Sequence, residues 1–148
     1  MIAANGQRAD GLTQLRTLMA TGQQPAIGRT MGFALEEIEP GRAVFAGAPD
    51  RSVYNPIDSV HGGYAATLLD SACGCAVHSR LTADQGYTTL ELKVAYHRRL
   101  TDATGPVRAE GVVVHLGRRA AFAEAKLTDA AGKLYASATS TLLVFDLP

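Results

Sequence analysis

The stretch from Gly62 to about Arg80 reads as a helix that is apolar on almost every side. It consists mainly of alanine, glycine, serine, cysteine and leucine, and Asp70 is the only formally charged residue between Ser59 and Ser79. A helix that is apolar all round is buried over most of its surface. Its small side chains allow a sheet to approach closely. The rest of the chain is therefore expected to form a sheet that wraps around this helix.

The segments before this helix read as a short helix and a hairpin. Apolar residues recur at helical spacing between positions 12 and 19, and Gly22 and Pro25 end that pattern. Residues 1–9 are polar and are expected to be frayed. Strands are predicted at 31–39 and 42–48, joined by a turn at Pro40-Gly41.

Four further strands are predicted after the helix, at residues 87–98, 107–115, 119–129 and 133–145. In the first of them, alternation places four large side chains on one face: Leu90, Leu92, Val94 and Tyr96. Short turns between the strands favour an antiparallel sheet. The prediction is one α+β domain over residues 1–148, with residues 1–24 as an N-terminal extension and helix.

Composition excludes several classes of protein. The chain has 148 residues, of which 47% are hydrophobic and 19% charged, and its formal net charge is zero. It should be globular, with no general affinity for nucleic acid or for anionic membranes. No apolar run is long enough to span a membrane, and no signal-peptide pattern is present, so a cytoplasmic location is expected. Cys73 and Cys75 lack metal-ligand spacing and read as packing residues.

Asp70 and the His61-Gly62-Gly63 segment point to chemistry. A carboxylate in an apolar segment is costly to desolvate and is rarely placed there without a partner. A helix N-terminus offers unpaired N–H groups that can stabilise a developing negative charge. The combination favours acyl transfer, with Asp70 as nucleophile or base. The alternative is that Asp70 is a structural carboxylate that caps a neighbouring loop.

The chain resembles the hotdog-fold thioesterases of the PaaI type over roughly residues 25–146. The resemblance rests on the order of elements and on Asn55, His61-Gly62-Gly63 and Asp70, with further similarity at 88–94 and 132–139. It implies a hotdog fold and hydrolysis of an acyl-CoA thioester without a metal or a separate cofactor, since coenzyme A is part of the substrate. It also implies a homodimer, often a dimer of dimers.

The same resemblance implies roles for individual residues. Asp70 would be the nucleophile or general base, and the Gly62 N–H would polarise the thioester carbonyl. Asn55 and His61 would order their loop and an attacking water, although each also suits a purely local role in the backbone. Thr89 matches a strand position where the family often has a hydroxyl that helps to place the water, and it is taken as catalytic, with Thr88 as the competitor for that position. Gly63 and Thr88 are the expected substrate contacts. Some relatives carry a hydroxyl residue four positions after the aspartate, where this chain has Gly74.

Two basic clusters suit the phosphates of coenzyme A, at residues 97–99 and at Arg118-Arg119. Arg118 and Arg119 are taken as the substrate-binding candidates. Basic residues at strand ends also occur for ordinary reasons of solubility, so this remains the alternative.

Helix geometry gives an independent reason to expect a dimer. Gly62 and Asp70 lie eight positions apart, about 12 Å along one helix at about 1.5 Å per residue. Reacting groups must approach to about 3–3.5 Å, so two antiparallel helices would have to share each site. A hotdog hydratase or dehydratase and a non-catalytic acyl-thioester-binding protein remain alternatives. The acyl group, and coenzyme A against an acyl-carrier protein, stay open.

Overall fold

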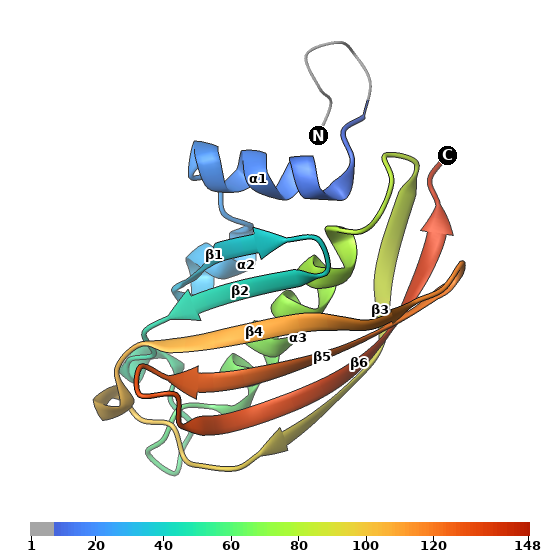
Figure 1. Ribbon diagram of the computed structural model, residues 1–148. Helices are drawn as coiled ribbons and strands as arrows, with labels where there is room; N and C mark the ends of the chain where they lie inside the picture. Colours follow the sequence, from blue (N-terminus) through green and yellow to red (C-terminus); the bar gives the residue numbers. More distant parts are fainter. Residues whose placement is uncertain (1–7) are drawn as a thin grey trace.

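A computed structural model describes residues 8–148, in which a curved sheet encloses one long helix (Figure 1). The helices are α1 (Gly11–Thr21), α2 (Ala26–Met31) and α3 (Gly62–His78), with short 3-10 turns at Arg51–Val53 and Asp102–Thr104. The strands are β1 (Phe33–Glu39), β2 (Arg42–Gly47), β3 (Gln85–Tyr96), β4 (Val107–Leu116), β5 (Ala120–Asp129) and β6 (Leu134–Asp146). For α3 and for β3 to β6, the predicted ends differ from these by at most two residues.

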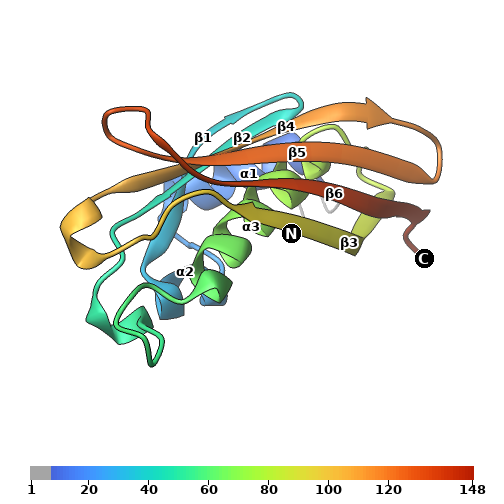
Figure 2. The ribbon, with the colours of Figure 1, turned by 90° about the horizontal axis from the view of Figure 1, so that it is seen from below.

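All six strands belong to one antiparallel sheet in the order β1-β2-β4-β5-β6-β3. The sheet curves around α3, which packs on its concave face (Figure 2). The α+β hotdog architecture predicted from the sequence is confirmed. β3 lies at one edge of the sheet, beside β6 only.

Small residues let α3 lie directly on the sheet. Leu68, Leu69 and Ala72 of α3 are fully buried. A Cβ atom at Gly111 of β4 would lie 2.4 Å from the carbonyl carbon and oxygen of Ala72, so only glycine fits there. The apolar surface of α3 is thereby covered by the sheet, as its composition predicts.

The N-terminal segment contains one helix more than predicted. Asp10 caps α1 by accepting a hydrogen bond from the Thr13 N–H at 2.8 Å, and Gly22 ends it in the left-handed conformation. α2 then follows Pro25 and ends at Gly32, so β1 begins at Phe33 and not at residue 31. A helix of six residues is too short to give a recognisable period. Most of the expected fraying at 1–9 falls on residues 1–7, outside the described residues.

The alternation predicted for β3 is wrong at Leu90. A β-bulge interrupts the pairing with β6 between Thr89 and Glu91, so Leu90 is the extra residue and is 62% exposed. Beyond the bulge, Leu92 and Val94 pack against the core as expected. Before it, the odd-numbered side chains of Tyr87 and Thr89 face the helix. The side chains that face the helix are therefore odd-numbered before the bulge and even-numbered after it.

No helix among residues 8–148 is long and apolar enough to cross a membrane.

Candidate functional site

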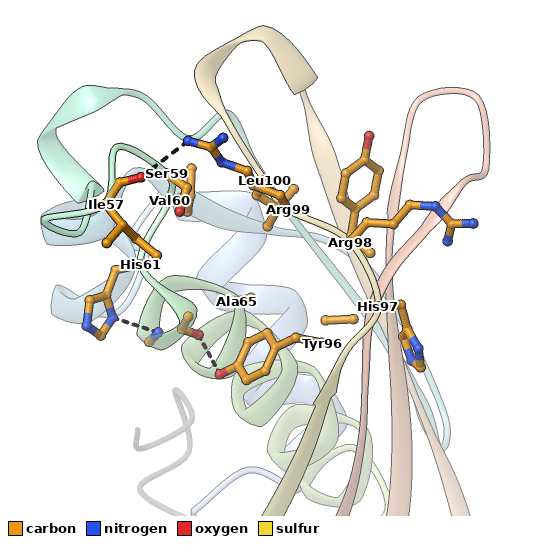
Figure 3. Close-up of a pocket in the computed structure, with 14 residues that line it drawn as sticks. Ile57, Ser59, Val60, His61, Ala65, Tyr96, His97, Arg98, Arg99 and Leu100 are labelled. Carbon is orange, nitrogen blue, oxygen red and sulfur yellow. Dashed lines mark hydrogen bonds between the residues drawn. The ribbon is translucent and has the colours of Figure 1, made fainter.

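His61 caps the N-terminus of α3. Its Nδ1 accepts a hydrogen bond from the Gly63 N–H at 2.8 Å (Figure 3). A neutral imidazole whose Nδ1 accepts carries its proton on Nε2. The Gly62 N–H is in the first turn, where no helical carbonyl can reach it, and none of residues 8–148 accepts a hydrogen bond from it. It is therefore available to a substrate oxygen.

Asn55 closes the loop that leads to His61. Its Oδ1 accepts hydrogen bonds from the N–H groups of Ile57 at 3.1 Å and Ser59 at 3.2 Å, and its Nδ2 donates to the Ser59 hydroxyl at 3.1 Å. Asp58 between them has a left-handed backbone, with φ of 61°. Asn55 therefore orders the loop, and its carbonyl oxygen is occupied by backbone donors.

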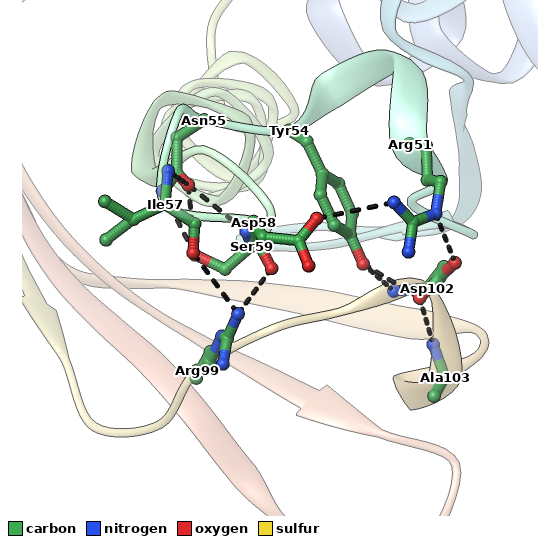
Figure 4. A network of polar contacts seen from close by, with 9 residues as sticks. All are labelled: Arg51, Tyr54, Asn55, Ile57, Asp58, Ser59, Arg99, Asp102 and Ala103. Carbon is green, nitrogen blue, oxygen red and sulfur yellow. Dashed lines mark hydrogen bonds and ion pairs between the residues drawn. The ribbon is translucent and has the colours of Figure 1, made fainter.

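A polar network holds this loop against the segment that follows β3 (Figure 4). Arg51 contacts Asp58 at 3.3 Å and Asp102 at 3.5 Å, and the Tyr54 hydroxyl donates to Asp102 Oδ1 at 2.8 Å. The hydrogen bond from Tyr54, helped by the charge of Arg51, holds the pKa of Asp102 below its ordinary value. Arg99 donates to the carbonyls of Ile57 and Asp58. These contacts fix the entry of α3.

A cavity of about 700 Å³ opens at the start of α3. His61 lies on one side of it and His97 and Arg98 on the other (Figure 3), and Gly62, Gly63 and Arg99 also line it. The Tyr96 hydroxyl spans the two sides by donating to the Gly62 carbonyl at 2.9 Å. The cavity therefore combines an available helix-terminal N–H with positive charge.

Asp70 lies in the middle of α3 and faces β3. Thr89 Oγ1 donates a hydrogen bond to Asp70 Oδ1 at 3.0 Å, whereas Thr88 is exposed. Asp70 and Thr89 line a second cavity of about 220 Å³. Its other lining residues are mainly apolar and come from α2, β1, β2, α3 and β3: Pro25, Ile27, Phe33, Phe45, Ser71, Gly74, Cys75 and Tyr87. A carboxylate thus lies beside an apolar cavity.

The predicted site residues fall into separate groups within one protomer. Asn55, His61, Gly62 and Gly63 lie together at the start of α3, and Asp70 and Thr89 lie together at its middle. Gly62 and Asp70 line different cavities.

Arg118 and Arg119 form a third group at the turn between β4 and β5. They line a hollow with Gln85, Val144, Phe145 and Asp146, at the end of the sheet opposite the start of α3. One protomer does not bring them to Gly62 or Asp70, and their binding of substrate stays a prediction.

Sequence reasoning missed the wall of the second cavity. α2 was not predicted, so Pro25 and Ile27 could not be assigned to it. Tyr87 had a usable signal, because it stands two residues before Thr89 and must share its face of the strand.

The two cysteines differ in exposure. Cys73 is buried, and Cys75 is half-buried and lines the second cavity. Burial, with a contribution from Asp70, raises the pKa of each thiol to about 12, so both are protonated at neutral pH. Among residues 8–148, no group of three or more His, Cys, Asp or Glu side chains is placed to hold a metal ion.

Residues 58–136 match the model of the Thioesterase superfamily, and this segment contains both His61-Gly62-Gly63 and Asp70. The chain belongs to this superfamily. A 1,4-dihydroxy-2-naphthoyl-CoA hydrolase from Listeria monocytogenes is 28% identical over 115 residues, which cover 78% of this chain and 92% of the relative.

Solved structures agree with this assignment. A variant of the phenylacetic acid degradation protein PaaI from Thermus thermophilus is 29% identical, with a TM-score of 0.73, over 80% of this chain and 98% of the other. A thioesterase family protein from Silicibacter pomeroyi has a TM-score of 0.80 at 25% identity, over 92% of this chain and 98% of the other. Membership of the superfamily supports hydrolysis of a thioester in general terms.

Proposed function

We propose that this protein hydrolyses an acyl-CoA thioester to the free acid and coenzyme A. The observation that carries the proposal is the Asp70 carboxylate, held by Thr89 at 3.0 Å on the wall of an apolar cavity. Such a carboxylate can attack the thioester carbonyl or remove a proton from an attacking water. If Asp70 attacks, the C–S bond breaks, the thiolate of coenzyme A leaves, and a water then hydrolyses the mixed anhydride to release the acid and regenerate the carboxylate. If Asp70 activates water, the water adds to the carbonyl, the same C–S bond breaks, and the acid forms directly while the proton goes to the leaving thiolate. A thioester is activated enough for either route to need no metal.

The Gly62 N–H is the proposed donor to the carbonyl oxygen. It lies at the N-terminus of α3 and no described residue uses it. A donor of this kind stabilises the oxyanion that forms on attack, by about 3–4 kcal/mol in comparable sites. His61 and Asn55 are proposed to hold the N–H in place, since both side chains bond to backbone groups beside it. The residue within the helix is the carboxylate Asp70, and His61 lies at the helix entry, which favours hydrolysis over hydration.

The active site is proposed to be shared between two protomers. Asp70 and Gly62 are separated by about 12 Å along α3, and they line different cavities. β3 is an edge strand and α3 runs antiparallel to it. Antiparallel pairing of two β3 strands would set the two α3 helices antiparallel. Asp70 of one protomer could then meet Gly62 of the partner subunit. Further pairing into a dimer of dimers stays a prediction.

Coenzyme A is the proposed carrier. The cavity at Gly62 is about 700 Å³ in volume and has the basic residues 97–99 on its wall. Guanidinium groups bind phosphates through paired N–H donors. The Listeria monocytogenes relative is named as a hydrolase of a CoA thioester, which supports the same choice.

Thiol release tests the proposal directly. Wild-type protein should release coenzyme A from at least one member of a panel of aryl- and fatty acyl-CoA esters. Asp70→Asn should abolish this turnover while the fold and the dimer persist, because the amide can neither attack nor accept the proton. Asp84→Asn, at an exposed position, serves as the matched control and should keep full activity. Wild-type-like turnover by Asp70→Asn would remove Asp70 from the mechanism.

A further inference from the structure

Tyr87 and Asp70 line the same cavity, and Tyr87 lies against α3 one helical turn beyond Asp70. Asp70 and Gly74 are four positions apart on α3 and so share one face, and Tyr87 and Thr89 share one face of β3. Thr89 pairs with Asp70 at 3.0 Å, and Tyr87 lies over Gly74. The cavity wall is therefore built from two neighbouring helix–strand pairs.

Gly74 makes the room that the tyrosine ring uses. A Cβ atom at Gly74 would lie 2.8 Å from the Tyr87 hydroxyl oxygen and 3.0 Å from Cε2. Cβ atoms essentially never approach so closely, so any larger residue would move the ring. In this chain the phenol hydroxyl occupies the place that a side chain at position 74 would take.

The hydroxyl of Tyr87 is free to bind a ligand. It makes no hydrogen bond to any of residues 8–148. Burial raises the pKa of Tyr87, with smaller contributions from Cys75 and Asp70, so the phenol stays protonated at neutral pH and can donate. The surrounding wall offers Phe33, Phe45 and Ile27, which bind apolar groups. A hydrogen-bond donor is thus presented beside apolar side chains, at the part of the cavity wall one helical turn beyond Asp70.

We propose that Tyr87 selects acyl groups that carry a hydrogen-bonding substituent at the end remote from the thioester. This inference rests on the proposed function, since it places the acyl group in the Asp70 cavity. With the thioester carbonyl at Asp70, an acyl group directed along α3 reaches Tyr87 about 6 Å further on, at about 1.5 Å per residue over one turn. Planar rings suit the aromatic lining, and a ring hydroxyl would meet the phenol.

A double comparison of substrates and variants tests the proposal. Thiol release is measured for benzoyl-CoA and for its 3-hydroxy and 4-hydroxy derivatives, with wild type and with Tyr87→Phe. For each protein, kcat/KM for the hydroxylated ester is divided by kcat/KM for benzoyl-CoA. This ratio is then compared between wild type and Tyr87→Phe, so that the intrinsic reactivity of each ester cancels. Tyr87→Phe should lower this ratio by about three- to tenfold for at least one isomer, the value of one hydrogen bond.

Binding to an inactive background gives a second readout. Asp70→Asn and the double variant Asp70→Asn/Tyr87→Phe are titrated with the same three esters by calorimetry. The hydroxylated ester should bind more weakly to the double variant, with binding of benzoyl-CoA unchanged.

The outcomes separate this proposal from the proposed function. Equal loss on all esters would overturn the selective role, because it would mean that the hydroxyl serves catalysis or packing. An unchanged ratio for both isomers would overturn it as well. In either case, turnover by wild type that Asp70→Asn abolishes would leave the thioesterase proposal standing. Absence of turnover by wild type on the whole acyl-CoA panel would instead count against the proposed function itself.

Discussion

Thr89 of β3 donates a hydrogen bond to the Asp70 carboxylate of α3 at 3.0 Å, and so joins the edge strand to the central helix at the candidate site. The contact fixes one oxygen of the carboxylate and leaves the other for a water or a thioester carbon. Thr88, next to it in sequence, points away and is exposed. Two adjacent threonines therefore provide a matched pair for testing the contact.

Thr89→Val should lower kcat by about three- to tenfold, which corresponds to one lost hydrogen bond. Valine keeps the shape and the strand propensity of threonine, so the fold should persist. KM should stay within about twofold, because the contact orients the carboxylate and does not hold the substrate. Steady-state kinetics on the best acyl-CoA ester measure both quantities. Thr88→Val should behave as wild type, and equal losses in the two variants would contradict a role specific to Thr89.

Arg98 and Arg118 differ in their distance from the proposed oxyanion donor. Arg98 lines the cavity at Gly62 and donates to the Leu134 carbonyl at 2.6 Å, whereas Arg118 lies at the opposite end of the sheet. Arg98→Ala should raise KM for an acyl-CoA by about three- to tenfold through loss of a phosphate contact.

A short acyl-pantetheine thioester, which lacks the nucleotide phosphates, provides the control for this prediction. Its KM should be the same for wild type and Arg98→Ala. Arg118→Ala is the comparison variant, and no effect on either substrate would assign the phosphate contact to Arg98. The opposite pattern, with a CoA-specific effect at Arg118 alone, would place the phosphates at the turn between β4 and β5, as the sequence predicts.

Gly111 sets the distance between α3 and the sheet. Gly111→Ala should destabilise the fold by about 3 kcal/mol or more, because its Cβ would overlap the backbone of Ala72, which cannot move aside as a side chain can. Gly132→Ala is the comparison. An added Cβ there would have open space around it, so the loss of stability arises only from the left-handed φ of 78° and should be about 1–2 kcal/mol. Urea unfolding measures both. A smaller loss at Gly111 than at Gly132 would show that the helix can shift.

Much of the fold was readable because one feature constrained the rest. The apolar helix around Asp70 required a covering sheet, and turn residues such as Pro40-Gly41 and Gly132 marked where its strands end. α2 escaped prediction because six residues carry too little periodicity. Without α2, the sequence could not predict that Pro25 and Ile27 line the Asp70 cavity.

The choice between Thr88 and Thr89 shows where sequence pattern fails. Strict alternation from Leu92 and Val94 would place Leu90 and Thr88 toward the helix. The bulge at Leu90 shifts that phase by one residue, and Thr89 meets Asp70 instead. Bulges have no reliable signature in one sequence. The family resemblance indicated Thr89 where alternation alone indicates its neighbour.

A shared active site makes a prediction that activity can be restored by mixing two inactive proteins. Asp70→Asn removes the carboxylate. Gly62→Pro removes the proposed oxyanion donor at the first helical position, where proline is tolerated and where His61 before it already has the extended backbone that proline requires. Gly62→Ala keeps the N–H and controls for the added Cβ, which would lie 3.0 Å from the Tyr96 ring.

In a mixed dimer, one site combines the intact Asp70 of the Gly62→Pro protomer with the intact Gly62 of the Asp70→Asn protomer. The other site carries both defects. After the two proteins are unfolded together and refolded at equal concentration, half of the dimers are mixed, so about a quarter of wild-type activity should return. A site contained within one protomer would give no restoration, because neither chain then holds both groups. The size of the recovered activity therefore decides whether Asp70 and Gly62 act on one thioester across the dimer.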